Sequence, residues 1–202
     1  MSEREVETAY GKAIVRLLAV DDPRAALVLG HGAAGGTDAP DLTAVASAAR
    51  VERLFVALVE QPYRVAGRRA PAPARQLDTA WTAVIDTLRR DELAGLSVVV
   101  GGRSAGARVA CRTASATGAA GVLCLAFPLQ PPSRSQSRPS RLPELDAVEA
   151  PTLVIQGRRD PFGVPPPGPR RTVVQVDGDH GLKADVDAVA AAAGQWLRTV
   201  TS

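Results

Sequence analysis

The most informative stretch of this 202-residue sequence is SVVVGGRSAGARVACRTA, residues 97–114. Its run of β-branched residues is typical of a buried strand, and the alanine-rich segment that follows is typical of a helix. Between them, residues 102–106 (GRSAG) form the pattern G-x-S-x-G. In a strand–turn–helix unit this pattern places the serine on a tight turn, where the residues two before and two after it must be small. We therefore expect Ser104 on a sharp turn, with Gly102 and Gly106 as its small neighbours.

Apolar runs and amphipathic segments alternate along the rest of the chain. The expected strands are residues 13–20, 25–29, 53–59, 97–100, 121–127, 152–156 and 172–176. The expected helices are 41–50, 76–90, 105–116 and 184–199, with a short turn at 144–149. Several strands are apolar throughout, as in strands covered on both faces. The alternation predicts an α/β fold with a mostly parallel twisted sheet, helices on both faces, and an antiparallel edge before residue 25.

Length and composition fit one globular domain spanning residues 1–202, with 46% hydrophobic residues. The net charge is only +3, the arginines are scattered in pairs, and aromatic residues make up 3%. This pattern does not favour a nucleic-acid partner, which would require clustered basic residues with aromatics for stacking. The N-terminus lacks the apolar core of a signal peptide, and no apolar run approaches membrane-spanning length. We expect a cytoplasmic protein without membrane contact.

Two segments are expected to form surface loops. Residues 130–143 (QPPSRSQSRPSRLP) are rich in proline, serine and arginine and lack apolar periodicity, and residues 163–171 are rich in proline. The region between the strands that end at Phe127 and begin at Thr152 has room for a loop and a short helix. We therefore expect no cap domain, and an open site with residues 63–73 as a second rim.

The two cysteines, Cys111 and Cys124, lie in apolar stretches and are expected to be buried free thiols. The sequence has no Cys/His spacing typical of zinc sites and no phosphate-binding G-x-x-x-x-G-K-[ST] pattern. We expect neither a metal nor a cofactor.

Polar residues follow two later strands. Asp160 lies in QGRRDPFG (156–163), and His180 in VVQVDGDHGLKADV (173–186). An aspartate before proline is also a good helix N-cap, and a loop histidine can simply be exposed. Nevertheless, the chain order Ser104, Asp160, His180 is the order of the α/β-hydrolases and differs from that of other serine hydrolases. We expect Ser104 as nucleophile, His180 as base and Asp160 as the acid that orients it.

The loop after an earlier strand, in ALVLGHGAAGG (26–36), consists of small residues. Backbone N–H groups that stabilise an oxyanion are preorganised, and a loop at this place can supply one of them. We expect the oxyanion hole to be formed by the N–H groups of Ala33 and of Ala105, which opens the helix after Ser104. His31 is expected to shape the turn.

The same loop supports an alternative interpretation. Residues 30–35 match G-x-G-x-x-G after a strand, and Glu60 ends the next strand, near where a ribose-binding acid would lie. A dinucleotide-binding protein is therefore a rival hypothesis. It leaves Asp160 and His180 unexplained, and it places the glycine motif after a later strand than usual.

Together these motifs make the chain resemble the short, capless α/β-hydrolases of the dienelactone-hydrolase-like kind. It is also similar to the hydrolase-like domain of the third subunit of the NSL chromatin complex. The matching stretches are LGHGAAGG, VEQPYRVAGRRAP, GGRSAGARVA, LCLAFPL, PTLVIQGRRDPFG and DGDHGLK. The resemblance implies an α/β-hydrolase fold with the triad Ser104, Asp160 and His180, and it marks Arg103 as a feature of the group.

The predicted function is that of a serine hydrolase that cleaves a small carboxylic ester or thioester through an acyl-enzyme. Dienelactone hydrolases carry a cysteine nucleophile, so their substrate does not transfer to Ser104. The chromatin relatives are scaffold proteins, so a non-catalytic interaction module is a second hypothesis.

Overall fold

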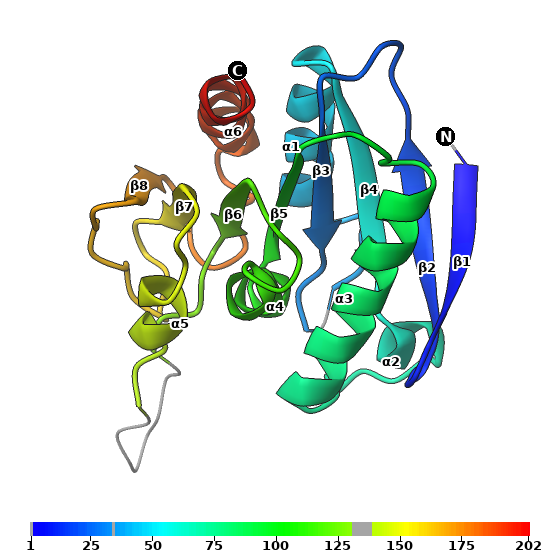
Figure 1. Ribbon diagram of the computed structural model, residues 1–202. Helices are drawn as coiled ribbons and strands as arrows, with labels where there is room; N and C mark the ends of the chain where they lie inside the picture. The colour runs from blue at the N-terminus through cyan, green and yellow to red at the C-terminus, as the bar shows by residue number, and fades with distance from the viewer. Residues whose placement is uncertain (1, 34, 131–138) are drawn as a thin grey trace.

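The computed structural model describes residues 2–33, 35–130 and 139–202. In this part of the chain, eight strands form one sheet with helices on both faces (Figure 1). The strands are β1 (Ser2–Thr8), β2 (Gly11–Leu18), β3 (Ala25–Gly30), β4 (Leu54–Glu60), β5 (Val98–Arg103), β6 (Gly121–Leu125), β7 (Thr152–Gly157) and β8 (Arg171–Val176). The helices are α1 (Pro40–Val51), α2 (Pro62–Val65), α3 (Ala74–Arg90), α4 (Ala105–Thr113), α5 (Leu142–Asp146) and α6 (Val186–Val200).

The order of strands in the sheet is β1-β2-β4-β3-β5-β6-β7-β8. The strands from β4 to β8 along this order pair in parallel, whereas β1 and β2 form an antiparallel edge. From β3 the chain first adds β4 on one side and then β5 on the other. Such a reversal opens a crevice at the carboxyl ends of the two central strands, where α/β proteins place their sites.

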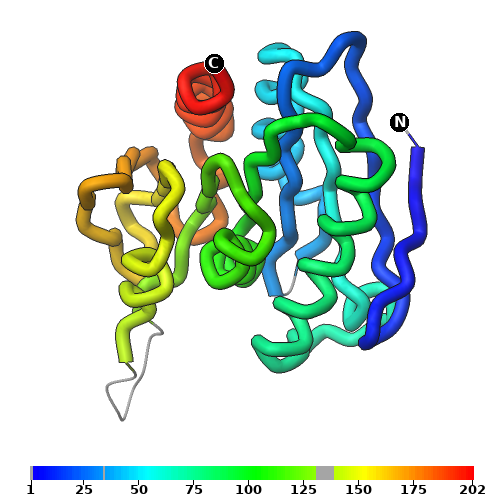
Figure 2. The backbone as a smooth tube through the Cα atoms, viewed as in Figure 1, coloured from blue at the N-terminus to red at the C-terminus, as the bar shows by residue number. Residues whose placement is uncertain are grey.

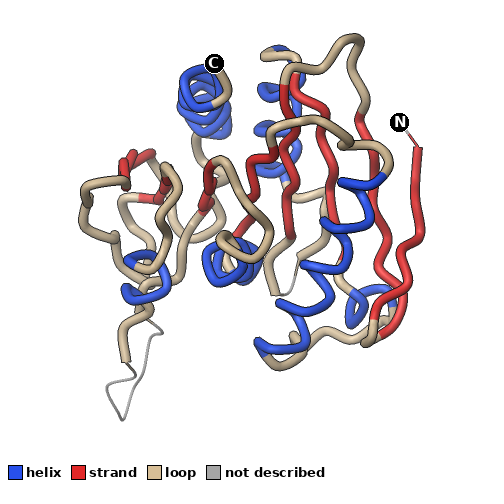
Figure 3. Tube along the Cα trace, in the orientation of Figure 1, coloured by secondary structure: helices blue, strands red, loops and turns tan. Residues whose placement is uncertain are grey.

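The helices form a layer on each side of the sheet (Figure 3). Helices α1 and α6 cover one face, and their apolar side chains form a core with β3, β4 and β7. Helices α3, α4 and α5 cover the other face and build the second core. The C-terminal α6 packs beside α1, although the two are far apart in the sequence (Figure 2). Both faces of the central strands are thus buried, which explains their continuous apolar sequence.

The α/β architecture, the parallel sheet and the antiparallel edge are confirmed, and each expected strand and helix is present with shifted ends. The sequence did not predict β1. Only Val6 of its seven residues is buried, and the other residues are charged or polar and show no apolar alternation. The sequence also did not predict the four-residue α2. Helix α5 begins at Leu142, earlier than expected, since Pro143 suits a first helical turn. Most of the expected surface loop at 130–143 lies outside the described residues.

Close backbone packing at the carboxyl end of β3 gives a test of the fold. A Cβ atom on Gly106 would lie 2.5 Å from the carbonyl oxygen of Gly30. We expect Gly106→Ala to lower the free energy of unfolding by about 1–3 kcal/mol, the usual range for overpacking. This would occur although alanine favours a helix over glycine by about 1 kcal/mol.

The measurement is chemical denaturation followed by circular dichroism. Gly35→Ala is the matched control, because a Cβ there meets nothing within 4 Å. Equal stabilities of the two variants would contradict the close packing of β3 against α4.

Candidate active site

Ser104 lies on the turn between β5 and α4. Its backbone angles are φ 52° and ψ −105°, a conformation that is strained for a residue with a side chain. The surrounding glycines explain how the turn is accommodated. A Cβ on Gly102 would lie 2.4 Å, and one on Gly106 2.5 Å, from the same oxygen of Gly30. The turn therefore requires small residues at both positions, as the sequence pattern indicates.

The three residues that the sequence proposes for a triad lie together at the carboxyl edge of the sheet. Nε2 of His180 is 2.9 Å from Oγ of Ser104, and its Nδ1 is 2.8 Å from Oδ2 of Asp160. The Asp160 side chain is fully buried, and the His180 side chain is 21% exposed. If Nδ1–H donates to the carboxylate, Nε2 is left free to accept the serine proton. This arrangement can activate a hydroxyl for nucleophilic attack.

Asp160 is held by donors besides the imidazole. Its Oδ1 accepts the backbone N–H of Phe162 at 2.9 Å, and its Oδ2 accepts Nε2 of Gln156 at 2.7 Å. Gln156 is completely buried near the end of β7. Sequence reasoning did not single it out, although an amide in the apolar run TLVIQG was an available signal. These bonds fix the position and orientation of the carboxylate beside the imidazole.

Phe162 was also missed, and it packs on the imidazole. The ring centroids of Phe162 and His180 lie 4.4 Å apart, with the planes inclined by 40°. The loops that carry the acid and the base are joined through their backbones as well, because Arg159 N–H donates to the oxygen of Gly178. The two loops that carry Asp160 and His180 are therefore linked to each other beside Ser104.

His31 does not join this group. It is buried, with Nδ1 2.8 Å from the oxygen of Gly32, and its Nε2 accepts the N–H of Gln61 at 3.1 Å. Because Nε2 accepts, the proton lies on Nδ1 and is donated to Gly32. Burial lowers the pKa of His31, so the side chain is neutral. It links the loop after β3 to the segment after β4, in keeping with a role in shaping the turn.

The two expected oxyanion donors lie next to the elbow. Ala105 is the first residue of α4, where backbone N–H groups have no partner within the helix. Ala33 lies in the loop after β3, and its carbonyl oxygen accepts a hydrogen bond from Tyr63 at 3.1 Å. A Cβ on Gly32, the residue before it, would lie 3.8 Å from Cβ of Ser104. The loop thus lies against the serine, and the role of both N–H groups stays a prediction.

The glycine motif at 30–35 does not form a dinucleotide-type turn. Helix α1 begins only at Pro40, whereas that fingerprint needs a helix opening directly after the glycines. Gly30 instead packs against Gly106 of α4. Glu60 ends β4, as expected, and pairs with Ile14 of β2. Among the described residues, no cluster of three or more histidine, cysteine, aspartate or glutamate side chains could hold a metal ion.

Cys111 and Cys124 are buried free thiols, as expected. Their sulfur atoms are 3.5 Å apart, between α4 and β6. The contact with Cys111, and burial after it, raise the pKa of the Cys124 thiol, which keeps it protonated and unreactive.

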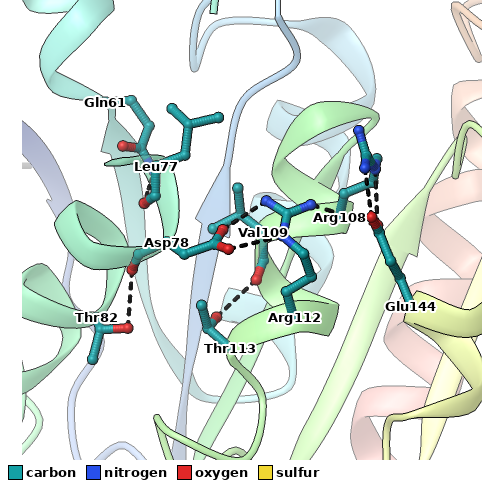
Figure 4. A network of polar contacts seen from close by, with 9 residues as sticks. All are labelled: Gln61, Leu77, Asp78, Thr82, Arg108, Val109, Arg112, Thr113 and Glu144. Carbon is teal, nitrogen blue, oxygen red and sulfur yellow. Dashed lines mark hydrogen bonds and ion pairs between the residues drawn. The ribbon is translucent and has the colours of Figure 1, made fainter. Parts of the chain in front are cut away.

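Helix α4 is anchored on both sides by charge pairs (Figure 4). Arg112 makes two bonds, of 2.8 and 2.6 Å, to Asp78 of α3. Arg108 makes two bonds, of 2.8 and 2.5 Å, to Glu144 of α5. Paired bonds of this kind restrict orientation as well as distance. They fix the helix whose first residue follows Ser104.

A serine on a strained turn after a central parallel strand, with an acid and a histidine after later strands, is the arrangement of α/β hydrolases. The chain belongs to the family of α/β hydrolase domains, whose model matches residues 23–200. No curated protein sequence matches it.

Several solved structures share the fold. A serine hydrolase without a lid from Xanthomonas campestris is 19% identical, covers 98% of this chain and 94% of its own, and has a TM-score of 0.73. Est1E from Butyrivibrio proteoclasticus is 11% identical, with 99% of both chains covered and a TM-score of 0.79. A dienelactone hydrolase from Anabaena variabilis is 19% identical, with 96% and 95% covered and a TM-score of 0.76.

At these identities the likeness establishes the fold, and the resemblance to the NSL subunit stays a prediction. None of the helices in the described part of the chain is long and apolar enough to cross a bilayer.

The buried His31 predicts a pH dependence of stability. The unfolded chain binds a proton on this residue as the pH falls through about 6.5, whereas the folded protein, with its lowered pKa, does not. The free energy of unfolding should therefore fall below that pH, by up to about 1.4 kcal/mol per pH unit from this residue.

Denaturation of the wild type and His31→Gln between about pH 7 and 5 tests this prediction. The variant should be less stable at pH 7 and should show the smaller decline, since other titrating groups are common to both proteins. If the free energy of unfolding declined equally with pH in both proteins, His31 would not be the buried neutral group that causes the decline.

Proposed function

We propose that this chain is a single-domain serine hydrolase, residues 1–202, that cleaves small carboxylic esters or thioesters. One observation carries the proposal: a continuous hydrogen-bond chain from Ser104 through His180 to a buried Asp160. The hydrogen-bond chain starts at a strained turn, which presents the serine hydroxyl to His180. Strain of this kind is concentrated at functional sites.

In the proposed reaction, Oγ of Ser104 attacks the ester carbonyl carbon while Nε2 of His180 accepts its proton. The tetrahedral oxyanion is stabilised by the N–H groups of Ala105 and Ala33. The imidazolium then protonates the leaving alkoxide or thiolate, which leaves an acyl-enzyme. Water then attacks the acyl carbonyl carbon while Nε2 of His180 accepts its proton, and the imidazolium returns that proton to Oγ of Ser104 as the carboxylic acid leaves. Asp160 holds the imidazole in the required tautomer and stabilises its charged form.

A preference for small acyl groups follows from the lack of a cap in the described part of the chain, where the only helix between β6 and β7 is the five-residue α5. A hollow of about 10 Å³ lies beside Ala105, lined among others by Tyr63, Trp81 and Val109, and it has room for about one water molecule. One fold relative is described as lacking a lid, and Est1E has been solved with ferulic acid bound. Both are in keeping with an open site for a small-molecule ester.

A fluorophosphonate probe tests the triad, because it reacts with a serine activated by an adjacent base. Wild-type protein should be labelled, and Ser104→Ala should not. Labelling should fall severely in His180→Ala and strongly in Asp160→Asn, which can hold the imidazole in the wrong tautomer. The measurement is the second-order labelling rate, with the modified residue identified by mass spectrometry.

Matched controls are Ser115→Ala, an exposed serine beyond α4, and His31→Gln; both should still be labelled. A folded wild-type protein that resists the probe would refute the proposal and favour a non-catalytic interaction module. Loss of labelling in His31→Gln but not in His180→Ala would mean that the wrong histidine has been assigned.

Acyl specificity is tested with a series of p-nitrophenyl esters. Acetyl and butyryl esters should be cleaved with higher kcat/KM than lauroyl and palmitoyl esters. Val109→Ala, which enlarges the hollow, should move the optimum towards longer chains. Val45→Ala, an equally buried valine on α1 on the other face of the sheet, should leave the optimum unchanged. A wild type that prefers palmitoyl esters would contradict the assignment.

A further inference from the structure

Arg103, the residue before Ser104, makes contacts that the triad does not require. Its Nε lies 3.0 Å from Oδ2 of Asp41, and its Nη2 donates a hydrogen bond of 2.9 Å to the backbone oxygen of His180. A Cβ on Gly32 would lie 2.9 Å from its Nη1. One side chain therefore contacts the loop of the base, the loop after β3 and the start of α1.

Asp41 braces this arginine. It lies in the first turn of α1, and its side chain is fully buried, whereas that of Arg103 is 18% exposed. Burial raises the pKa of the Asp41 carboxyl, and the positive charge of Arg103 opposes this effect. The contact between Nε and the carboxylate is an ion pair without hydrogen-bond geometry, so it holds the guanidinium near α1 by charge. The hydrogen bond of the same planar group, from Nη2, goes to the carbonyl of His180.

His180 needs such a support. It lies between β8 and α6, outside any helix or strand, in a turn closed by one backbone hydrogen bond from the N–H of Leu182 to the oxygen of Asp179. Phe162 and Asp160 contact its ring, and Arg103 holds its backbone. Because Arg103 is adjacent to the nucleophile in the chain, its bond sets the distance between base and serine directly.

We propose that Arg103 is a positioning residue that, braced by Asp41, holds His180 within hydrogen-bond distance of Ser104. This inference rests on the proposed function. It assigns Arg103 no contact with substrate. Its effect is exerted through the placement of the imidazole, where an error of about 1 Å can cost about 100-fold in rate.

The test measures fluorophosphonate labelling rates and kcat and KM for p-nitrophenyl acetate. Arg103→Met should lower the labelling rate and kcat by about 100-fold, with KM nearly unchanged. Arg103→Lys should give a labelling rate and a kcat between those of the wild type and Arg103→Met. Its ammonium keeps the charge but lacks the forked guanidinium that reaches both Asp41 and the backbone oxygen of His180. Arg158→Lys is the control, an exposed arginine near the acid loop, and it should match the wild type.

A second variant separates positioning from folding. Arg103→Met alone leaves a buried carboxylate unpaired, which is destabilising, whereas Arg103→Met with Asp41→Asn removes both charges. The double variant should recover thermal stability yet remain as slow as Arg103→Met, because the carbonyl of His180 still lacks its donor. Recovery of the rate together with stability would reduce Arg103 to a structural role and overturn the inference.

Coupling to the base is tested by combining Arg103→Met with His180→Ala. If Arg103 acts through His180, its substitution should cost little further activity once the imidazole is gone. A full additional loss would place its effect elsewhere and overturn the inference. If the wild type is labelled and the Arg103 variants react equally fast, this inference alone fails. An unlabelled wild type refutes the proposed function itself.

Discussion

The backbones of β3, β5 and α4 meet where Gly30, Gly102 and Gly106 pack without side chains. The carbonyl oxygen of Gly30 lies so close to both other glycines that no Cβ fits at either position. This contact lets the chain turn from β5 into α4 within one residue, and that residue, Ser104, takes the strained conformation. The placement of the Ser104 hydroxyl beside His180 and that of the N–H groups at the start of α4 both depend on it.

The remaining site residues reach the serine because parallel strands end at the same edge of the sheet. Asp160 follows β7 and His180 follows β8, so pairing of these strands brings acid and base together. Buried polar groups then remove the remaining freedom. Gln156 and the N–H of Phe162 fix the carboxylate, which fixes the imidazole. Hydrogen bonds inside a protein are stronger than in water, so these bonds hold the carboxylate and the imidazole together.

Charge pairs between arginine and acidic side chains fix helices against neighbouring elements in this molecule. Arg108 and Arg112 join α4 to its neighbours, and Arg103 with Asp41 joins the end of β5 to α1. Surface pairs of this kind contribute little to stability, and buried pairs often contribute none. Their value here is geometric, because each one restricts a backbone element that carries or adjoins a site residue.

The sequence by itself determined the α/β class, the parallel sheet and the turn at Ser104, and it was enough to propose Asp160 and His180 as partners of the serine. These features depend on local patterns: continuous apolar runs, glycines at fixed offsets and the chain order of three residues. It missed β1, whose residues are mostly exposed at the edge of the sheet and so leave no apolar pattern. Only the tertiary structure revealed the roles of Gln156, Phe162 and Asp41. Their contacts join segments that are distant in the sequence, or depend on the direction of a side chain. The spacing of apolar residues along the sequence carries no information on either.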